Sequence, residues 1–158
     1  MPIPKKILSF LEKVKAKHEV VEHRTVYTAF DKVQTLKVSE KIIGKTLILR
    51  INGSLAIVLI PSNKNLDKNK LKRISKKKKI DFAKELLIRR KIKGVKVGAI
   101  PPFGNLWNLP TFIDKNLLKQ QKIIVNGGDY RFSIKIRSND FKKLIPDLVI
   151  GSFSKVKK

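Results

Sequence analysis

The sequence predicts one mixed α/β domain that spans residues 1–158. A chain of 158 residues with 42% hydrophobic residues can bury its own core without disulfides or metal ions. Two pairs of β-rich segments are joined by turn sequences, and segments with helical periodicity lie around them. No internal repeat or linker divides the chain, so these elements are expected to share one core.

The first 40 residues are expected to hold two helices around an extended segment. Residues 4–18 have apolar side chains at helical spacing on one face and lysines on the other. Residues 20–27 are predicted to be extended. Thr28 is a favourable N-cap for a helix that reaches about Ser39, and Asp31 suits the first turn of that helix.

The middle of the chain contains the clearest hairpin signal. Asn52-Gly53 separates two apolar, β-rich segments, Lys45–Ile51 and Leu55–Pro61. A short basic helix is then expected from Leu66-Asp67 to about Ser75, followed by the lysine run 76–79.

Further along, Asp81 is expected to cap a helix over residues 82–92 that ends near Gly94. The expected apolar stripe of this helix consists of Phe82, Ala83, Leu86 and Leu87.

A second hairpin is expected near the C-terminus. Ile123–Asn126 and Tyr130–Ile136 flank Gly127-Gly128-Asp129, and residues 130–136 alternate as in a half-buried strand. Ser138 is predicted to cap a last helix that stops at Pro146, and residues 155–158 are expected to be frayed.

The charge balance favours a polyanionic partner. The 37 Lys and Arg residues exceed the 12 Asp and Glu residues by 25, which predicts salt-dependent binding of nucleic acid. Enrichment in Lys, Ile and Asn is also what an AT-rich coding sequence produces. No apolar run approaches a membrane span, and the N-terminus lacks the apolar region of a signal peptide, so we expect a cytoplasmic protein.

Several kinds of site are not expected. The chain has no cysteine and only two histidines, so we predict no metal site and no thiol nucleophile. A P-loop, a G-x-G-x-x-G motif, H-E-x-x-H and G-x-S-x-G are all missing from the sequence.

The most unusual segment is the run from Val97 to Ile113, which has no charged residue. Gly98, Pro101, Pro102 and Gly104 disfavour a helix or a central strand there. One interpretation is a pocket wall whose backbone amides face a ligand, and the other is a buried loop that only packs. In the first interpretation the amides of Gly98, Ala99 and Ile100 could form an oxyanion hole, although a structural turn also explains the spacing.

Four other residues are candidates for a site. Lys45 shares a strand face with apolar residues, so it either stands at the rim of an apolar cavity or extends to water. Asp129 and Ser133 could face the same pocket, or Asp129 could simply form the turn. His23 is better explained as a half-buried, hydrogen-bonded histidine than as a general base.

Four segments, taken in order, resemble the YbaK/prolyl-tRNA-synthetase-associated editing domain family. They are H23-R-T-V-Y-T28, G44-K-T-L-I-L49, V97-G-A-I-P-P-F-G104 and I124-V-N-G-G-D129 followed by Ser133-Ile134. The resemblance extends from about residue 5 to residue 153. It implies a curved mixed β-sheet surrounded by helices.

The resemblance also implies an activity, which is deacylation of mischarged tRNA in translation quality control. The substrate would be the aminoacylated 3′ end of tRNA, usually tRNA(Pro), and no cofactor would be needed. The family lysine falls on Lys45 and the family G-x-x-x-P loop on Gly98–Pro102, so Lys45, Gly98 and Ala99 are the expected catalytic residues. The other expected substrate-binding residues are Tyr27, Thr28, Ile100, Pro102, Phe103, Gly128, Asp129 and Ser133.

The chain departs from some family members, which carry a histidine where this chain has Gly-Gly-Asp-Tyr, so the amino acid removed stays open. Whether an aminoacyl-tRNA synthetase docks also stays open. One alternative is a non-catalytic, basic RNA- or ribosome-binding protein on the same scaffold. Another is an esterase or amidase that acts on small aminoacyl compounds.

Overall fold

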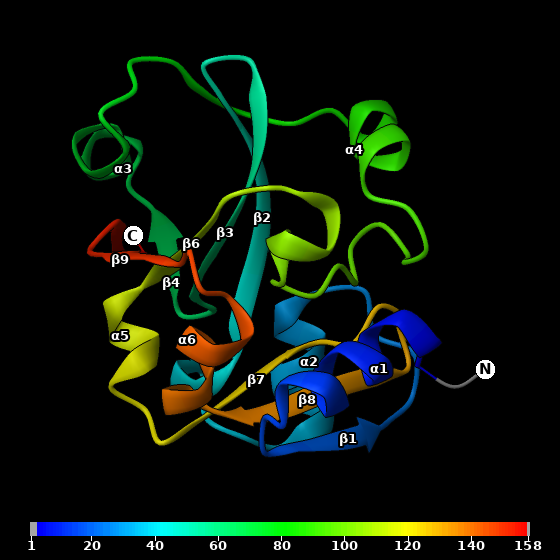
Figure 1. Cartoon of the computed structure of the whole chain (residues 1–158). Coiled ribbons are helices and arrows are strands. Elements are labelled where there is room, and N and C mark those ends of the chain that lie inside the picture. Colours follow the sequence, from blue (N-terminus) through cyan, green and yellow to red (C-terminus); the bar gives the residue numbers. More distant parts are fainter. Residues whose placement is uncertain (1–2, 158) are drawn as a thin grey trace.

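The strands are distributed over three sheets, with helices packed around the two larger ones (Figure 1). The structure is a computed structural model that describes residues 3–157, so residues 1, 2 and 158 of the expected domain lie outside it. It confirms the predicted α/β class with a mixed sheet surrounded by helices.

The described strands are β1 (His18–Glu22), β2 (Gly44–Ile51), β3 (Ser54–Pro61), β4 (Lys64–Leu66), β5 (Ile80–Phe82), β6 (Thr111–Asp114), β7 (Lys122–Asn126), β8 (Phe132–Arg137), β9 (Val149–Gly151) and β10 (Ser154–Val156). The described α-helices are α1 (Lys5–Val14), α2 (Ala29–Leu36), α3 (Lys68–Ser75), α4 (Glu85–Lys91), α5 (Lys115–Leu118) and α6 (Phe141–Leu144). Short 3-10 turns cover Glu40–Ile42, Gly104–Trp107 and Ser138–Asp140. None of the helices within residues 3–157 combines the length and the apolar character that crossing a bilayer requires.

The five-stranded sheet has the order β5-β2-β3-β6-β9 and lies between α3 and α4 (Figure 1). Strands β2 and β3 form the predicted antiparallel hairpin, whereas β6 runs parallel to both β3 and β9. Leu49 packs in the apolar cluster that contains Leu71 of α3, and the adjacent Ile48 packs in the cluster that contains Ile88 of α4. Alternate residues of β2 therefore fill the cores on opposite faces of the sheet.

The three-stranded sheet has the order β1-β8-β7 and carries α1 and α2 on opposite faces. Ile123 and Val125 share a core with Leu11 of α1, while Ile124 packs with Val33 of α2. A single parallel bridge, between Ile43 and Ile124, joins this sheet to the residue before β2. The bridge brings the start of β2 beside α2 and β7.

Local signals predicted several elements correctly. Thr28 caps α2, because its hydroxyl accepts a 3.0 Å hydrogen bond from the Asp31 amide. Asp67 caps α3 in the same way through the Lys70 amide at 3.1 Å. Both hairpins and the turn at Asn52-Gly53 also lie where the sequence predicts them. Helix α1 forms as expected but ends at Val14, so residues 15–18 are not helical and His18 begins β1.

The helix predicted over residues 82–92 is wrong at its start. Residues 80–82 instead form edge strand β5 against β2, with Asp81 opposite Arg50, and α4 begins only at Glu85. Phe82 and Leu86, expected in the apolar stripe, are 55% and 63% exposed. Burial of Ile80 in the sheet core and pairing along β2 outweigh the local capping signal of Asp81.

Three further expectations at the C-terminal end need correction. Residues 111–113 belong to β6 in the five-stranded sheet, so the uncharged segment is a loop only in its first part. Ser138 does not cap a helix, because its hydroxyl donates to the Gln121 carbonyl at 3.3 Å. Residues 155–156 are not frayed but pair with β4, and Lys158 lies outside the described residues.

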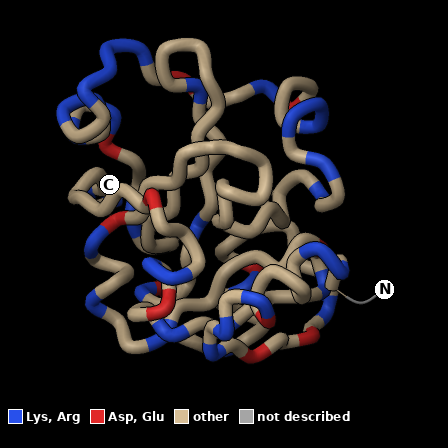
Figure 2. The backbone as a smooth tube through the Cα atoms, viewed as in Figure 1, with Lys and Arg blue, Asp and Glu red and all other residues tan. Residues whose placement is uncertain are grey.

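Lys and Arg residues occur throughout the chain, with marked concentrations on α3, the following loop and α4 (Figure 2). The loop contains the lysine run 76–79, and α4 ends in Arg89, Arg90 and Lys91. Both helices flank the five-stranded sheet, so the sheet stands between two basic surfaces.

Candidate functional site

A cavity of about 300 Å³ lies where α2, the start of β2, the loop 97–100 and the end of β7 meet. Six of the predicted site residues line it, namely Tyr27, Thr28, Lys45, Gly98, Ala99 and Asp129. Lys45 and Gly98 are 53 positions apart in the sequence, yet both line the same cavity. The structure thus brings together the strand cation and the glycine loop that the sequence singled out.

Lys45 is the second residue of β2 and is half-buried at the cavity. Its ammonium donates a 3.0 Å hydrogen bond to the carbonyl oxygen of Lys64, which leaves two N–H groups for other acceptors. Burial lowers the pKa of Lys45, and the positive charge of Lys157 lowers it further. Along the same strand face Leu49 and Ile51 are buried, as the alternating pattern predicted.

The loop 97–100 contributes Gly98 and Ala99 to the lining of this cavity. Gly98 has a φ of +90°, a conformation that favours glycine, and it is exposed. Among residues 3–157 no acceptor is hydrogen-bonded to the Gly98 amide. The Ala99 amide, in contrast, donates to the Lys96 carbonyl at 3.0 Å. The prediction that Ala99 offers a free donor is therefore wrong, because a backbone turn already uses that amide.

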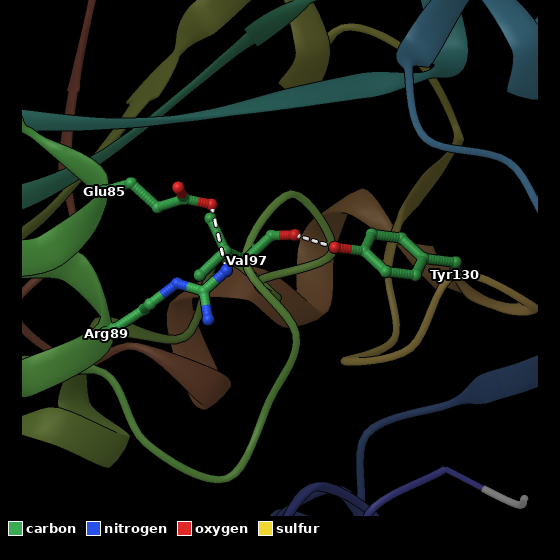
Figure 3. Close-up of polar contacts among 4 residues, drawn as sticks. All are labelled: Glu85, Arg89, Val97 and Tyr130. Atoms are coloured by element: carbon green, nitrogen blue, oxygen red, sulfur yellow. Dashed lines mark hydrogen bonds and ion pairs between the residues drawn. The ribbon is translucent and has the colours of Figure 1, made fainter.

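Hydrogen bonds from the β7–β8 connection hold this loop in place. The Gly128 amide donates to the Ala99 carbonyl at 2.8 Å, and the Gly128 carbonyl accepts from the Lys96 amide at 2.9 Å. The Tyr130 hydroxyl donates to the Val97 carbonyl (Figure 3). Gly128 itself does not line the cavity, so its observed contacts support the loop rather than a direct substrate-binding role.

Besides Gly128, three residues of the uncharged segment that were predicted to bind substrate lie outside the cavity lining. Phe103 is fully buried and packs on Phe10 with 5.3 Å between ring centroids. Pro102 is also buried. Ile100 faces an adjoining hollow of about 250 Å³ that it shares with Thr46 and Gly98. The uncharged segment is thus buried at Pro102 and Phe103, as the interpretation of this segment as a packing loop required.

Asp129 lines the cavity, but its carboxylate is engaged by its own turn. It accepts a 3.0 Å hydrogen bond from the Arg131 amide and lies 3.8 Å from the Arg131 Nε. Asp129 thus forms the turn and faces the cavity at the same time.

His23 and Ser133 are hydrogen-bonded to each other at one side of the cavity. Nε2 of His23 lies 2.9 Å from the Ser133 Oγ, and its Nδ1 lies 2.7 Å from the Arg24 carbonyl. Because a carbonyl only accepts, Nδ1 carries the proton and Nε2 accepts from Ser133. Burial lowers the pKa of His23, the Arg24 carbonyl opposes this shift, and Lys32 adds to it. Ser133 is fully buried and does not line the cavity, so the bonded-histidine interpretation fits this pair.

Lys32 is a cavity residue that the sequence reasoning missed. It lies on α2 and is only 5% exposed, and its ammonium donates to the Asn126 Oδ1 at 2.7 Å. Burial lowers its pKa to about 8. A signal was present in the sequence, because Lys32 occupies the helical stripe formed by Ala29, Val33 and Leu36.

Asn126 connects Lys32 to the glycine loop. Its Oδ1 accepts from Lys32, and its Nδ2 donates to the Ile100 carbonyl at 3.2 Å. Thr46, which also lines the cavity, has a buried hydroxyl oxygen without a hydrogen-bond partner in the described structure. Across residues 3–157, no three His, Asp or Glu side chains gather as a metal site requires.

Comparison with known proteins gives one family and several similar folds. A sequence model of the family described as aminoacyl-tRNA editing domain matches residues 23–144. The crystal structure of a hypothetical protein superposes with a TM-score of 0.83 at 21% identity, covering 96% of this chain and 100% of that chain.

A candidate trans-editing enzyme for prolyl tRNA synthetase superposes with a TM-score of 0.81 at 20% identity, covering 98% of each chain. At these identities the two structures are similar to this chain in fold. No curated protein matches the sequence.

Proposed function

The chain belongs to the aminoacyl-tRNA editing domain family, and we propose that it is a trans-editing hydrolase that deacylates mischarged tRNA. The proposed substrate is tRNA(Pro) that carries a small non-cognate amino acid. The single observation that carries this proposal is that the exposed residue Gly98, whose amide has no hydrogen-bond partner among residues 3–157, lines the same cavity as Lys45.

The chemistry needs little more than positioning and charge stabilisation, because an aminoacyl ester is already activated. Water adds to the ester carbonyl carbon, negative charge develops on the carbonyl oxygen, and the bond to the ribose oxygen then breaks. The products are the free amino acid and tRNA with a restored ribose hydroxyl. An amide that points at the developing oxyanion favours this transition state over the substrate.

In this proposal the Gly98 amide donates to the oxyanion, and Lys45 holds an oxygen of the ester or of the terminal nucleotide. The ribose hydroxyl or the α-amine of the substrate activates the water. His23 is a poor candidate for this step, because its Nε2 lone pair is occupied by Ser133. The hydrogen bonds that hold the loop 97–100 in place support the role of Gly98, because a preorganised donor needs no rearrangement during the reaction.

Binding of the tRNA end is supported by exposed aromatic and basic side chains near the cavity. Tyr27 lines the cavity and is 66% exposed, and Phe30 on α2 is 65% exposed. Aromatic faces of this kind stack on unpaired bases. The adjoining hollow extends toward α4, whose last turn is basic, so a phosphate backbone would meet positive charge there.

The test is a deacylation panel with tRNA(Pro) charged with alanine, cysteine or serine, and with proline as the control. We expect at least one mischarged ester to be hydrolysed faster than the proline ester. Salt-sensitive binding of every tRNA without loss of any ester would instead favour the non-catalytic RNA-binding alternative. Equal hydrolysis of aminoacyl-adenosine and aminoacyl-tRNA would favour the small-molecule esterase.

A further inference from the structure

The Lys32 ammonium is a buried cation without an acidic partner. Only 5% of Lys32 is exposed, and its one hydrogen bond, 2.7 Å to Asn126, is to a neutral amide oxygen. No carboxylate within residues 3–157 lies within ion-pair distance of it. Lysine is almost never fully buried unless it is paired, so this arrangement lacks an anion.

The groups around Lys32 do not supply that anion. Burial lowers the pKa of His23 on the cavity wall, and Lys45 adds a second positive charge. Asp129 is the acidic residue of the cavity, but its carboxylate is held by Arg131. The cavity therefore has an excess of positive charge that faces the ligand.

We infer that the Lys32 ammonium is the anion-binding group of this cavity and pairs with an anionic oxygen of the ligand. This inference rests on the proposed function for the identity of the ligand. An aminoacyl-tRNA end offers two sources of such an oxygen, namely a carboxylate on the acyl side chain and the phosphate of the terminal nucleotide.

The depth of Lys32 favours the acyl carboxylate. Lys32 is nearly inaccessible, whereas Tyr27 of the same cavity is two-thirds exposed and marks the entrance. The small acyl end of the ligand reaches deeper than the phosphate backbone. Acyl groups with an acidic side chain are therefore expected to be bound in preference to neutral groups of the same size, which adds acidic acyl groups to the small ones named in the proposed function.

The experiment uses analogues in which a 3′-amide replaces the ester, so that binding is measured without hydrolysis. Four probes combine a glutamyl or glutaminyl group with adenosine that either carries or lacks a 5′-phosphate. Isothermal titration calorimetry compares the wild-type protein with Lys32→Met and with Lys37→Met, which removes an exposed lysine at the end of the same helix. We expect the wild type and Lys37→Met to bind the glutamyl probes at least about tenfold more tightly than the glutaminyl probes.

Loss of this glutamyl preference in Lys32→Met would support the acyl carboxylate as the partner. Loss of a 5′-phosphate preference in the same variant would support the phosphate instead. Equal affinities of Lys32→Met and Lys37→Met for all four probes would overturn the inference.

A second measurement, the pH dependence of probe binding, uses the wild-type protein and needs no substitution of Lys32. In the wild type the preference for the anionic probe should decline as the pH rises through about 8, where Lys32 loses its proton. A preference that persists unchanged to pH 9.5 would contradict the inference. Because the probes cannot be hydrolysed, this result is independent of the deacylation panel, whose failure would count against the proposed function alone.

Discussion

The Gly128 amide donates a 2.8 Å hydrogen bond to the Ala99 carbonyl, which joins the β7–β8 connection to the glycine loop. Gly128 also accepts from Lys96, so its peptide groups bind the loop on both sides of Gly98. The orientation of the free Gly98 amide thus depends on a residue that does not itself line the cavity. This relationship leads to the first prediction.

Gly128→Ala should destabilise the protein and lower deacylation. Gly128 has a φ of +92°, and an added Cβ would lie 3.1 Å from Val95 and 3.2 Å from Ile7 and Pro4. We expect the free energy of unfolding to fall by about 2 kcal/mol, measured by urea denaturation. Gly53→Ala is the matched control, because Gly53 has a φ of +86° but no atom within 4 Å of the added Cβ. Equal losses of unfolding free energy in the two variants would show that the close contacts around Gly128 do not add to the destabilisation.

Gly98→Ala should reduce catalysis more than stability. Its added Cβ would be 3.5 Å from Tyr130, an ordinary contact, so the strain comes from the φ of +90° and is relieved by rotation of the loop. We expect a loss of about 10²-fold in kcat, the usual effect of removing one oxyanion donor. Gly94→Ala has similar backbone strain at φ +89° outside the cavity, so it should lose stability and keep its kcat. Equal kcat losses in both variants would argue against a role for the Gly98 amide.

Elements that depend on neighbouring residues could be predicted from the sequence, and elements that depend on distant pairing could not. The turn at Asn52-Gly53 and the cap at Thr28 are specified within a few residues. Strand β5 exists because Ile80 pairs opposite Ile51 on a strand that lies far earlier in the chain. Strand β6 similarly requires the β3 edge, which the proline and glycine content of the preceding loop does not reveal.

The same division applies to the site. The strand pattern singled out Lys45 and the uncharged segment singled out Gly98, the family resemblance agreed with both, and both line one cavity. The bond between Lys32 and Asn126 joins residues 94 positions apart and has no local signature. Phe103 was expected to bind substrate from the family resemblance, but an apolar loop can equally fill a core, and Phe103 is fully buried.

Lys45→Ala should abolish deacylation while the protein stays folded. The folded state loses only the hydrogen bond from Lys45 to the Lys64 carbonyl, so stability should change by no more than about 1 kcal/mol. Lys41→Ala, which removes an exposed lysine just before β2, controls for the loss of one positive charge. Single-turnover deacylation of a mischarged tRNA at saturating enzyme separates a loss of catalysis from a loss of tRNA binding. Unchanged turnover in Lys45→Ala would refute the proposed role.

His23 should be neutral at pH 7, with its proton on Nδ1. Its pKa lies below the ordinary value of 6.5, so the unfolded state binds the proton more tightly than the folded state. The stability that comes from keeping His23 neutral in the folded state is fully present above about pH 6.5, and it is lost as the pH falls toward the lowered pKa. Imidazole ¹H–¹⁵N spectra test both statements, and the missing signals in His23→Gln assign the resonances of the two histidines. An imidazolium signal from His23 at pH 7 would contradict the prediction.

Lys32→Met should stabilise the protein at neutral pH. The pKa of Lys32 is lowered from 10.5 to about 8, so keeping it charged in the folded state costs about 3 kcal/mol below pH 8. The neutral side chain removes this cost but leaves the Asn126 Oδ1 without its donor. The expected net gain at pH 7 is therefore smaller, about 1–2 kcal/mol in urea denaturation.

The pH dependence of this gain identifies its cause. Between pH 8 and pH 10.5 the unfolded wild type binds more protons at Lys32 than the folded protein does, so its stability at this site rises with pH. The stability difference between Lys32→Met and the wild type should therefore shrink from pH 7 to pH 9.5. Lys37→Met, which alters the exposed lysine just after the same helix, should show no such change. A difference for Lys32→Met that stays constant over this range would mean that the gain comes from side-chain packing rather than from removing a buried charge.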